Sequence, residues 1–363
     1  MTHRDDLEAL MLIPGLSGHE ERVAKAIRAR LDQIGIAHHT DRLGNVISTL
    51  EGDSNAPSVL LFTHMDQLGF ITRKITDDGF IKVERLGGVP ERALAAQPVL
   101  LCVGEGRDVP GVITNKAHHA TAADEKYQVV RAPDLVIDAG FASKENAFKA
   151  GVQIGTPIVY QPRVAAMGEH RIVGTSVDDR AGCAVQLAVA EALASRTGGP
   201  TVHLVFSVQE EFNLRGAVVA AQNLKPDIAI QIDLMLATDT PDMADRGEMA
   251  LGGGPGISLY SFHGRGTLNG VIPHPAMVRL MEETAMSNTI SLQRSAQVGV
   301  LTDLSYVQLL GEGVACVDVG FPMRYSHSAN EMCDLRDLEA LQTLLTRAIA
   351  AIGPSFSLSR EIA

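Results

Sequence analysis

Hydrophobic and polar positions along the chain alternate between helical and strand-like spacing. Residues 18–35 ("GHEERVAKAIRARLDQIG") place apolar side chains at helical intervals, whereas 45–50 and 58–64 are short apolar runs typical of strands. Further along, the same criteria predict helices at 179–195, 214–222, 274–285 and 334–351, and strands at 201–208, 227–233 and 313–320. Strands that alternate with helices indicate a largely parallel sheet covered by helices on both faces, an α/β fold.

The segment 68–163 has a different pattern. Short β-prone runs such as "GFITRKI" and "GFIKVERL" are separated by turn signals, here "TDDG", and only 143–151 predicts a short helix. We therefore expect a small, β-rich domain at 68–163. This domain would interrupt a single α/β domain formed by residues 1–67 and 164–363.

Composition and charge narrow the class of protein. The chain has 363 residues, is 45% hydrophobic and carries a formal net charge of −12, which argues against a nucleic-acid partner. No apolar stretch is long enough to span a bilayer, and the first residues lack the apolar core of a signal peptide. The four cysteines show no paired spacing, so we expect reduced thiols in a cytoplasmic enzyme without a membrane partner.

Metal-binding residue types follow the predicted strands. Ligands of α/β sheets bind at the carboxyl ends of the strands, so the residues that follow each apolar run are candidates for one site. Those residues are His64, Asp66, Asp178, Glu210, Glu211, Asp233 and His327. The adjacent pair Glu210–Glu211 ends an apolar run, where two like charges need compensation such as a multivalent cation.

Each candidate also has a simpler interpretation. Asp178 could cap the helix that follows it, and His64 with Asp66 could form only a local hydrogen bond. Asp233 could be a solvated strand end, His327 a loop histidine, and Glu210–Glu211 surface charge. Single motifs of this kind often mislead, whereas their shared position at strand ends favours a common site.

The candidate residues suit a site with two metal ions. Histidine nitrogens and carboxylate oxygens favour zinc, with cobalt and manganese as alternatives, over calcium. Two histidines and three carboxylates exceed the ligands of one catalytic metal but suit two ions that share a carboxylate. One of the adjacent glutamates then remains as a general base for a water molecule, which describes the hydrolysis of a peptide or amide bond.

Five motifs occur in the order found in one enzyme family. "THMDQLGF", "GTSVDDRAGC", "VQEEFNLRGA", "IQIDLM" and "RYSHSANE" resemble those of the dinuclear metallo-aminopeptidases of the tetrahedral (TET) type. That family includes glutamyl and deblocking aminopeptidases and proteins labelled endoglucanase M. The segment "DLVIDAGFASKENAFKAGVQIGTPI" resembles the end of the domain inserted in these enzymes, so the likeness runs nearly end to end.

The resemblance implies a role for each candidate residue. His64, Asp178 and Asp233 would hold one metal, and Asp178, Glu211 and His327 the other. Glu210 would be the catalytic base, Asp66 would orient His64, and the peptide bond between Asp178 and Asp179 would be cis. The insertion would be a PDZ-like dimerisation domain, and dimers would assemble into a homododecamer.

Several positions depart from the family pattern. Gln67 stands where glutamate is usual, Phe212 and Asn213 replace Val-Gly, and 299–306 replaces a Gly-Gly-Thr-Asp stretch. None of these changes removes a ligand or the base, so they bear on the substrate. We therefore expect an aminopeptidase of short peptides, with an amidase or deacylase of a small metabolite as the alternative and an inactive scaffold as a third.

Four other motifs have no predicted catalytic role. His118 and His119 are expected in a surface loop, and the histidines of "HGRG" and "IPHP" are expected to be structural. The glycine-rich run 251–258 lacks the lysine of a phosphate-binding loop, and we expect its backbone to be shaped around a substrate. Glycosidase chemistry is disfavoured, because the carboxylates it needs are committed to metals.

Overall fold

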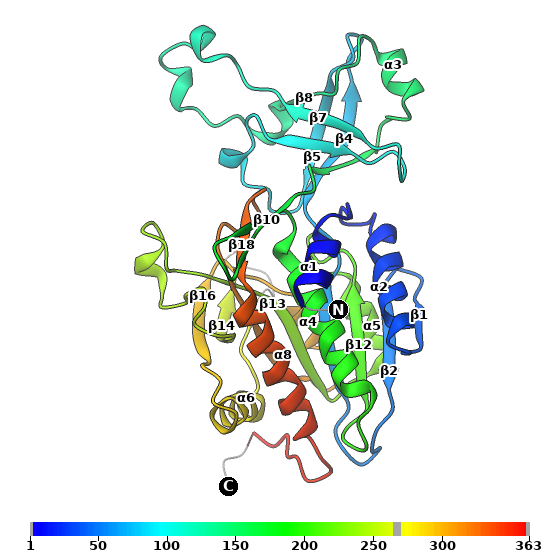
Figure 1. Cartoon of the computed structure of the whole chain (residues 1–363), viewed down its shortest axis with the longest axis vertical. Helices are drawn as coiled ribbons and strands as arrows, with labels where there is room; N and C mark the ends of the chain where they lie inside the picture. The colour runs from blue at the N-terminus through cyan, green and yellow to red at the C-terminus, as the bar shows by residue number, and fades with distance from the viewer. Residues whose placement is uncertain (1–2, 264–269, 361–363) are drawn as a thin grey trace.

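The computed structural model describes residues 3–263 and 270–360 and contains a large mixed sheet with a small barrel at one end (Figure 1). The strand order in the large sheet is β1-β2-β12-β3-β13-β17-β14-β15, and β16 pairs with β14. The bounds are β1 (His38–Thr40), β2 (Val46–Leu50), β3 (Val59–His64), β12 (Val202–Ser207), β13 (Ile228–Leu236), β14 (Gly256–Phe262), β15 (Gly270–Val271), β16 (Gln293–Val298) and β17 (Ala315–Met323).

The centre of the large sheet is parallel. β12, β3, β13 and β17 pair parallel with one another in that order, and β2 and β14 pair antiparallel with β12 and β17 on either side of this group. Residues of the central strands are buried on both faces, as expected where helices cover a parallel sheet. The predicted α/β fold class is confirmed.

Alternating residues of the central strands pack into two different hydrophobic cores, one on each face of the sheet. Val59 and Leu61 of β3 pack in the larger core, whereas Leu60 and Phe62 pack in the core on the opposite face. The larger core includes α1 (His3–Met11), α2 (Glu21–Gln33), α4 (Val177–Ala194), α6 (Pro275–Ser287) and α8 (Leu335–Ala350). The other face is covered by α5 (Gly216–Leu224) and α7 (Leu304–Val307).

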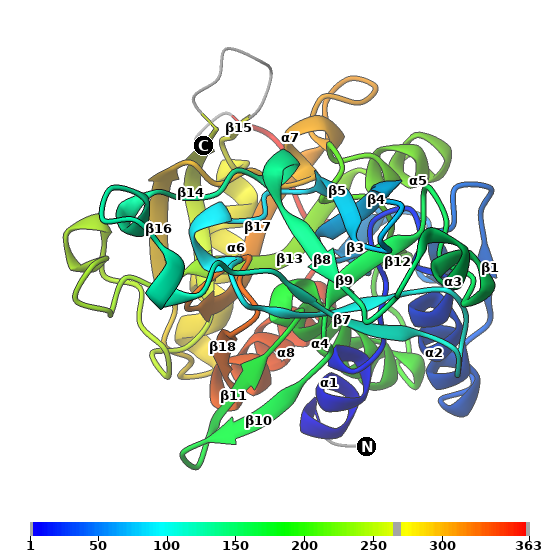
Figure 2. The same cartoon turned by 90° about the horizontal axis from the view of Figure 1, so that it is seen from above.

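The β-rich insertion forms a closed barrel. Its strands follow the order β4-β5-β8-β7-β6-β9 and enclose a separate hydrophobic core that includes Phe70, Val99 and Ile158. The bounds are β4 (Gly69–Ile75), β5 (Ile81–Leu86), β6 (Pro98–Leu101), β7 (Val109–Ile113), β8 (Val136–Asp138) and β9 (Pro157–Tyr160), with the short helix α3 (Lys144–Lys149). Seen from above, β7, β8 and β9 lie across the end of the large sheet (Figure 2).

A small antiparallel sheet lies between the barrel and the helices. It consists of β10 (Val164–Met167), β11 (Arg171–Gly174) and β18 (Glu331–Asp334), in that order. β11 leads directly into α4, and β18 follows the loop after β17. Within the described residues, no helix is long and apolar enough to cross a membrane.

Two sequence predictions differ from the structure. β13 continues to Leu236, paired with Met323, so Asp233 lies inside the strand rather than after it. The glycine-rich run does not line the candidate substrate cavity. Instead, the amides of Gly252 and Gly254 donate to the Asp337 carboxylate at 2.8 Å each, so this part of the backbone is shaped around the first turn of α8, and Ser258 at the end of the run lines a smaller cavity beside the main one.

Candidate metal centre and active site

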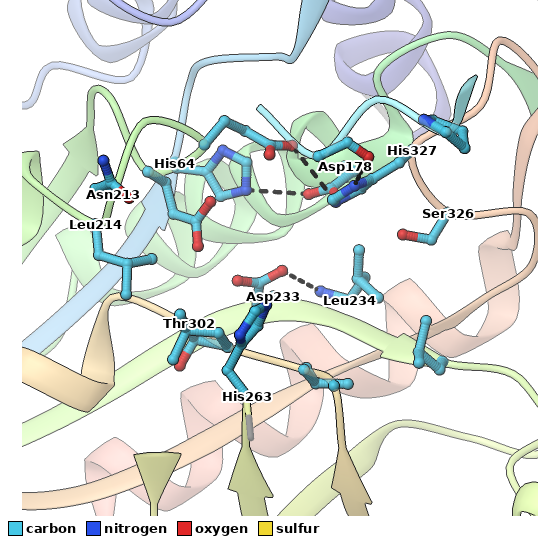
Figure 3. Close-up of a pocket in the computed structure, with 18 residues that line it drawn as sticks. His64, Asp178, Asn213, Leu214, Asp233, Leu234, His263, Thr302, Ser326 and His327 are labelled. Carbon is cyan, nitrogen blue, oxygen red and sulfur yellow. Dashed lines mark hydrogen bonds and ion pairs between the residues drawn. The ribbon is translucent and has the colours of Figure 1, made fainter. Parts of the chain in front are cut away.

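The predicted site residues come together at one end of the large sheet. His64 is the last residue of β3, Asp178 opens α4, and Asp233 projects from β13. Glu210 and Glu211 lie in the loop after β12, and His327 lies in the loop after β17. Figure 3 shows the labelled side chains of His64, Asp178, Asp233 and His327 turned toward a common cavity.

Two sets of ligand atoms share one carboxylate. His64, Asp178 and Asp233 form one set, and Asp178, Glu211 and His327 form the other, with atoms within 4.8 Å of one another in each set. Asp178 Oδ1 lies 3.0 Å from His64 Nε2, while its Oδ2 lies 3.5 Å from His327 Nε2. One oxygen of Asp178 thus faces each set, which is the arrangement of a bridging carboxylate.

Two neighbouring aspartates at the start of α4, Asp178 and Asp179, make different contacts. The carboxylate of Asp178 faces the two histidines, whereas Asp179 Oδ1 accepts a hydrogen bond from the Gly182 amide at 3.1 Å. Asp179 therefore makes the helix-start contact that the sequence also allowed for Asp178. The peptide bond between them is cis, which confirms the prediction.

Asp66 supports the glutamate pair more directly than it supports His64. Its Oδ1 and Oδ2 accept hydrogen bonds from the amides of Glu210 and Glu211, both at 3.0 Å. His64 Nδ1 lies 3.1 Å from the Asp66 carbonyl oxygen and 3.4 Å from its carboxylate. Asp66 is fully buried, so a single carboxylate fixes the backbone of both glutamates and contacts one histidine.

Glu331 was not predicted as a site residue. Its buried carboxylate accepts hydrogen bonds from the His327 amide at 2.7 Å and from the Asp178 amide at 3.1 Å. It therefore ties together the two segments that carry these side chains. The signal in the sequence is its position four residues after His327, at the end of the motif "RYSHSANE".

The segment before the barrel's first short helical turn also reaches the site. The carbonyl oxygen of Gly88 lies 3.0 Å from His327 Nδ1, on the ring edge opposite Asp178. A hydrogen bond at this nitrogen fixes the ring orientation and leaves Nε2 free to act as a ligand. A side chain at Gly88 would meet His327 Nδ1 at 2.7 Å, so the close approach requires glycine.

We expect Gly88→Ala to displace the His327 ring and to weaken metal binding about 10–100-fold, the usual effect of disturbing a residue that orients a ligand. Metal titration monitored by activity measures this change. The matched control is Gly353→Ala, because a methyl group there meets nothing within 4 Å. Equal metal affinity in the two variants would show that Gly88 does not position His327.

Burial and hydrogen bonding shift the pKa values of the carboxylates in the site. Burial raises the pKa of Glu211 to about 7 and the pKa of Glu210 well above its usual value, with neighbouring carboxylates adding to the rise in both. Burial would also raise the pKa of Asp178, but hydrogen bonds with His327 and His64 outweigh this and hold the pKa well below its usual range. A site with this many buried carboxylates favours a nearby positive charge.

The donor set fits divalent cations. Four carboxylates line the cavity, those of Asp178, Glu210, Glu211 and Asp233, and no described lining residue is a lysine or arginine. Histidine nitrogens and carboxylate oxygens are the donors that zinc, cobalt and manganese accept. The residues present therefore fit metal ions in composition, in charge and in the grouping of ligand atoms around Asp178.

The cavity above the ligands has a volume of about 410 Å³ and is partly formed by residues that depart from the family pattern. Asn213, Val300 and Leu301 line it, whereas Gln67 does not. Phe212 is 45% exposed and stacks on Arg215. The 299–306 segment and Asn213 thus shape the substrate space, while Phe212 and Gln67 do not line it.

One histidine predicted to be structural also lines the cavity. His263, from the "HGRG" motif, lies on the far side of Asp233 from the ligand histidines (Figure 3). The histidine of "IPHP" is structural as expected, because His274 Nδ1 accepts the Ala276 amide at 3.2 Å at the start of α6. No spacing rule marks His263, since only the tertiary fold brings β14 to the cavity.

Histidines and carboxylates grouped in two sets at the end of an α/β sheet are typical of metal-dependent hydrolases. Residues 44–344 match the profile of the M42 glutamyl aminopeptidase family, and the chain belongs to this family. It is therefore a metallo-aminopeptidase, a hydrolase that acts on peptide bonds, as the sequence motifs indicated.

Two curated relatives show the breadth of this similarity. The chain is 37% identical over 344 residues to the putative aminopeptidase SgcX of Escherichia coli (strain K12), covering 94% of this chain and 92% of that protein. It is 30% identical to the lysyl aminopeptidase of Pyrococcus furiosus, covering 94% and 95% of the two chains.

Solved structures agree with the fold. An aminopeptidase from the archaeon Desulfurococcus kamchatkensis superposes with a TM-score of 0.90 at 32% identity, covering 98% of this chain and 96% of that chain. The TET1 peptidase of Pyrococcus horikoshii, which can assemble into a tetrahedron or a large octahedral shell, gives a TM-score of 0.86 at 27% identity and covers 97% and 100% of the two chains.

Proposed function

We propose that the protein is a dinuclear aminopeptidase of short peptides. His64, Asp178 and Asp233 would hold one divalent ion, and Asp178, Glu211 and His327 the second, with zinc favoured over cobalt and manganese. When bound, the ions lower the pKa of a water molecule and polarise the scissile carbonyl. The single observation that supports this assignment is the pair of ligand sets that share Asp178.

Glu210 is the residue available for proton transfer. It lines the cavity, is buried, and belongs to neither ligand set. Its backbone is held by the bond from its amide to Asp66 Oδ1, which keeps this part of the loop beside the neighbouring ligand Glu211. A buried carboxylate with a raised pKa is suited to accept a proton from water and to deliver it to the leaving amine.

The substrate class can be tested by a comparison of two compound series. The alternative substrate is a non-peptide amide, such as an acylated small metabolite, and it is motivated by the residues of 299–306 that line the cavity. We expect hydrolysis of aminoacyl-nitroanilides and no hydrolysis of N-acyl compounds, with the enzyme loaded separately with zinc, cobalt and manganese. Turnover of N-acyl compounds alone would replace the peptidase assignment, and no turnover in any metal would favour a scaffold role.

We further propose that the barrel mediates dimerisation within a closed dodecamer in the cytoplasm. Tyr127, Val129 and Val130 lie on one barrel loop and are 91%, 47% and 50% exposed, an apolar surface of the kind that marks an interface. A solved TET1 structure that contains a dodecamer, and that is 28% identical to this chain, supports twelve subunits. All four cysteines are free, which suits a reducing compartment.

Light scattering tests the assembly. Twelve chains of 38.7 kDa give a particle of about 460 kDa, and we expect this mass for the metal-loaded protein. Tyr127→Asp should reduce the mass by placing a charge in the interface, whereas Tyr127→Phe should leave it unchanged. A stable wild-type species near the dimer mass of about 77 kDa would contradict the closed assembly.

A further inference from the structure

A second, smaller cavity lies behind Asp233. It adjoins the main cavity, because both are lined by Asp233, Leu234, Leu236, Val300 and Thr302. Its own volume is about 20 Å³, enough for one group of the size of a water molecule. A side chain that entered from the main cavity would therefore end here in a compact terminal group.

Three side chains that line the small cavity are more than nine-tenths buried, and each carries one oxygen without a hydrogen-bond partner in the described part of the chain. Asp318, Gln297 and Ser261 are 2%, 7% and 4% exposed. No described residue forms a hydrogen bond with Asp318 Oδ2, Gln297 Oε1 or Ser261 Oγ. Buried oxygens are normally paired, so an unpaired set of this kind indicates a ligand that donates several hydrogen bonds.

The charged residues that line the small cavity are all acidic. Asp233 and Asp318 are acidic, and no described lining residue is basic. Burial raises the pKa of Asp318 to about 7, although the hydrogen bond from Thr302 Oγ1 to its Oδ1, at 2.9 Å, opposes the rise. A positive group beside Asp318 would stabilise the carboxylate form.

The strand register places Asp318 behind the metal ligands. Asp233 pairs with Gly320, and Gln231 pairs with Asp318, so Asp318 lies two residues farther from the strand end. Gln231 Nε2 donates to Asp233 Oδ2 at 3.1 Å, which shows that these side chains share one face of the sheet. Two residues of a strand span about 6.5 Å and neighbouring strands lie about 4.8 Å apart, so the backbones of Asp233 and Asp318 are about 8 Å apart.

We propose that the small cavity receives the ammonium group of an N-terminal lysine, with Asp318 as the residue that determines specificity. This inference rests on the proposed aminopeptidase function. An ammonium group has three donors for the three unpaired oxygens and is compact, whereas a guanidinium group is larger and planar. The four-carbon stem of lysine suits the separation between Asp233 and Asp318, and Leu236 and Val300 provide apolar walls for it.

Specificity constants for lysyl-, arginyl- and leucyl-nitroanilide test the proposal. We expect the wild type to favour lysine over both others, and Asp318→Leu to lower the ratio of the lysine to the leucine constant by about 10²-fold or more, because the ammonium would lose its charged partner. Asp318→Asn should give an intermediate ratio. The matched control is Asp242→Asn, an exposed acid outside the cavity, which should leave the ratio unchanged.

A measurement on the wild type tests the proposal without depending on variants that could misfold. Free L-lysine should inhibit cleavage of leucyl-nitroanilide at least about tenfold more strongly than L-norleucine, which has a similar stem without the ammonium. Equal inhibition, or an unchanged ratio in Asp318→Leu, would mean that the cavity holds only water and would overturn the inference. A wild type that cleaves no aminoacyl substrate would instead overturn the proposed function.

Discussion

Glu210→Gln is expected to reduce kcat by about 10²–10⁴-fold, the usual contribution of a general base. Glutamine keeps the shape of the side chain and the amide bond to Asp66, but it cannot accept a proton from water. Because Glu210 belongs to neither ligand set, the metal content should remain at the wild-type level. Steady-state kinetics and elemental analysis of the same preparation measure both quantities.

Glu211→Gln is the matched control, because it makes the same chemical change one residue away. Glu211 belongs to the set with Asp178 and His327, and its Oε1 lies 3.7 Å from His327 Nε2. This variant should lose metal as well as activity. If Glu210→Gln keeps near-normal turnover, or if the two variants lose metal equally, the division of roles between the two glutamates is wrong.

Asp178→Asn is expected to have the largest effect on metal content. Asp178 is the only residue common to both ligand sets among the described residues, and its two oxygens face different histidines. Asparagine removes the charge and one of the two oxygen ligands, so both ions should be lost. Turnover should fall at least as far as in Glu210→Gln, by about 10²–10⁴-fold or more.

The measurement is the metal content after dialysis against a fixed concentration of zinc, with Glu211→Gln alongside. We expect Asp178→Asn to lose both ions and Glu211→Gln to lose only the ion held with His327. Thermal unfolding of both variants shows whether the chain is still folded. A folded Asp178→Asn protein that retains a full metal complement would contradict the shared ligand.

The site could be predicted from the sequence where apolar runs end in polar ligands. His64 closes β3, and Glu210 and Glu211 follow β12, because the parallel strands of the sheet end at one edge. Asp233 was predicted to follow its strand, whereas β13 continues past it to Leu236 and the side chain still lines the cavity. Asp178 follows β11, which belongs to the small antiparallel sheet rather than to the large one.

Other features could not be predicted because they depend on tertiary contacts. Glu331 accepts hydrogen bonds from the backbone amides of His327 and Asp178. Every residue except proline has such an amide, so the pattern of side chains in the sequence does not reveal these contacts. Gly88 reaches His327 from a segment 239 residues away. Asp318 sits within an apolar run, and only the pairing of β17 with β13 and β14 shows which cavity it faces.

The most direct test of the account is anomalous X-ray scattering from crystals of the zinc-loaded protein, measured at the zinc absorption edge. We predict two zinc peaks per chain, one beside His64 and Asp233 and one beside Glu211 and His327, with Asp178 adjacent to both. A single peak at full occupancy, or peaks at other residues, would contradict the dinuclear site.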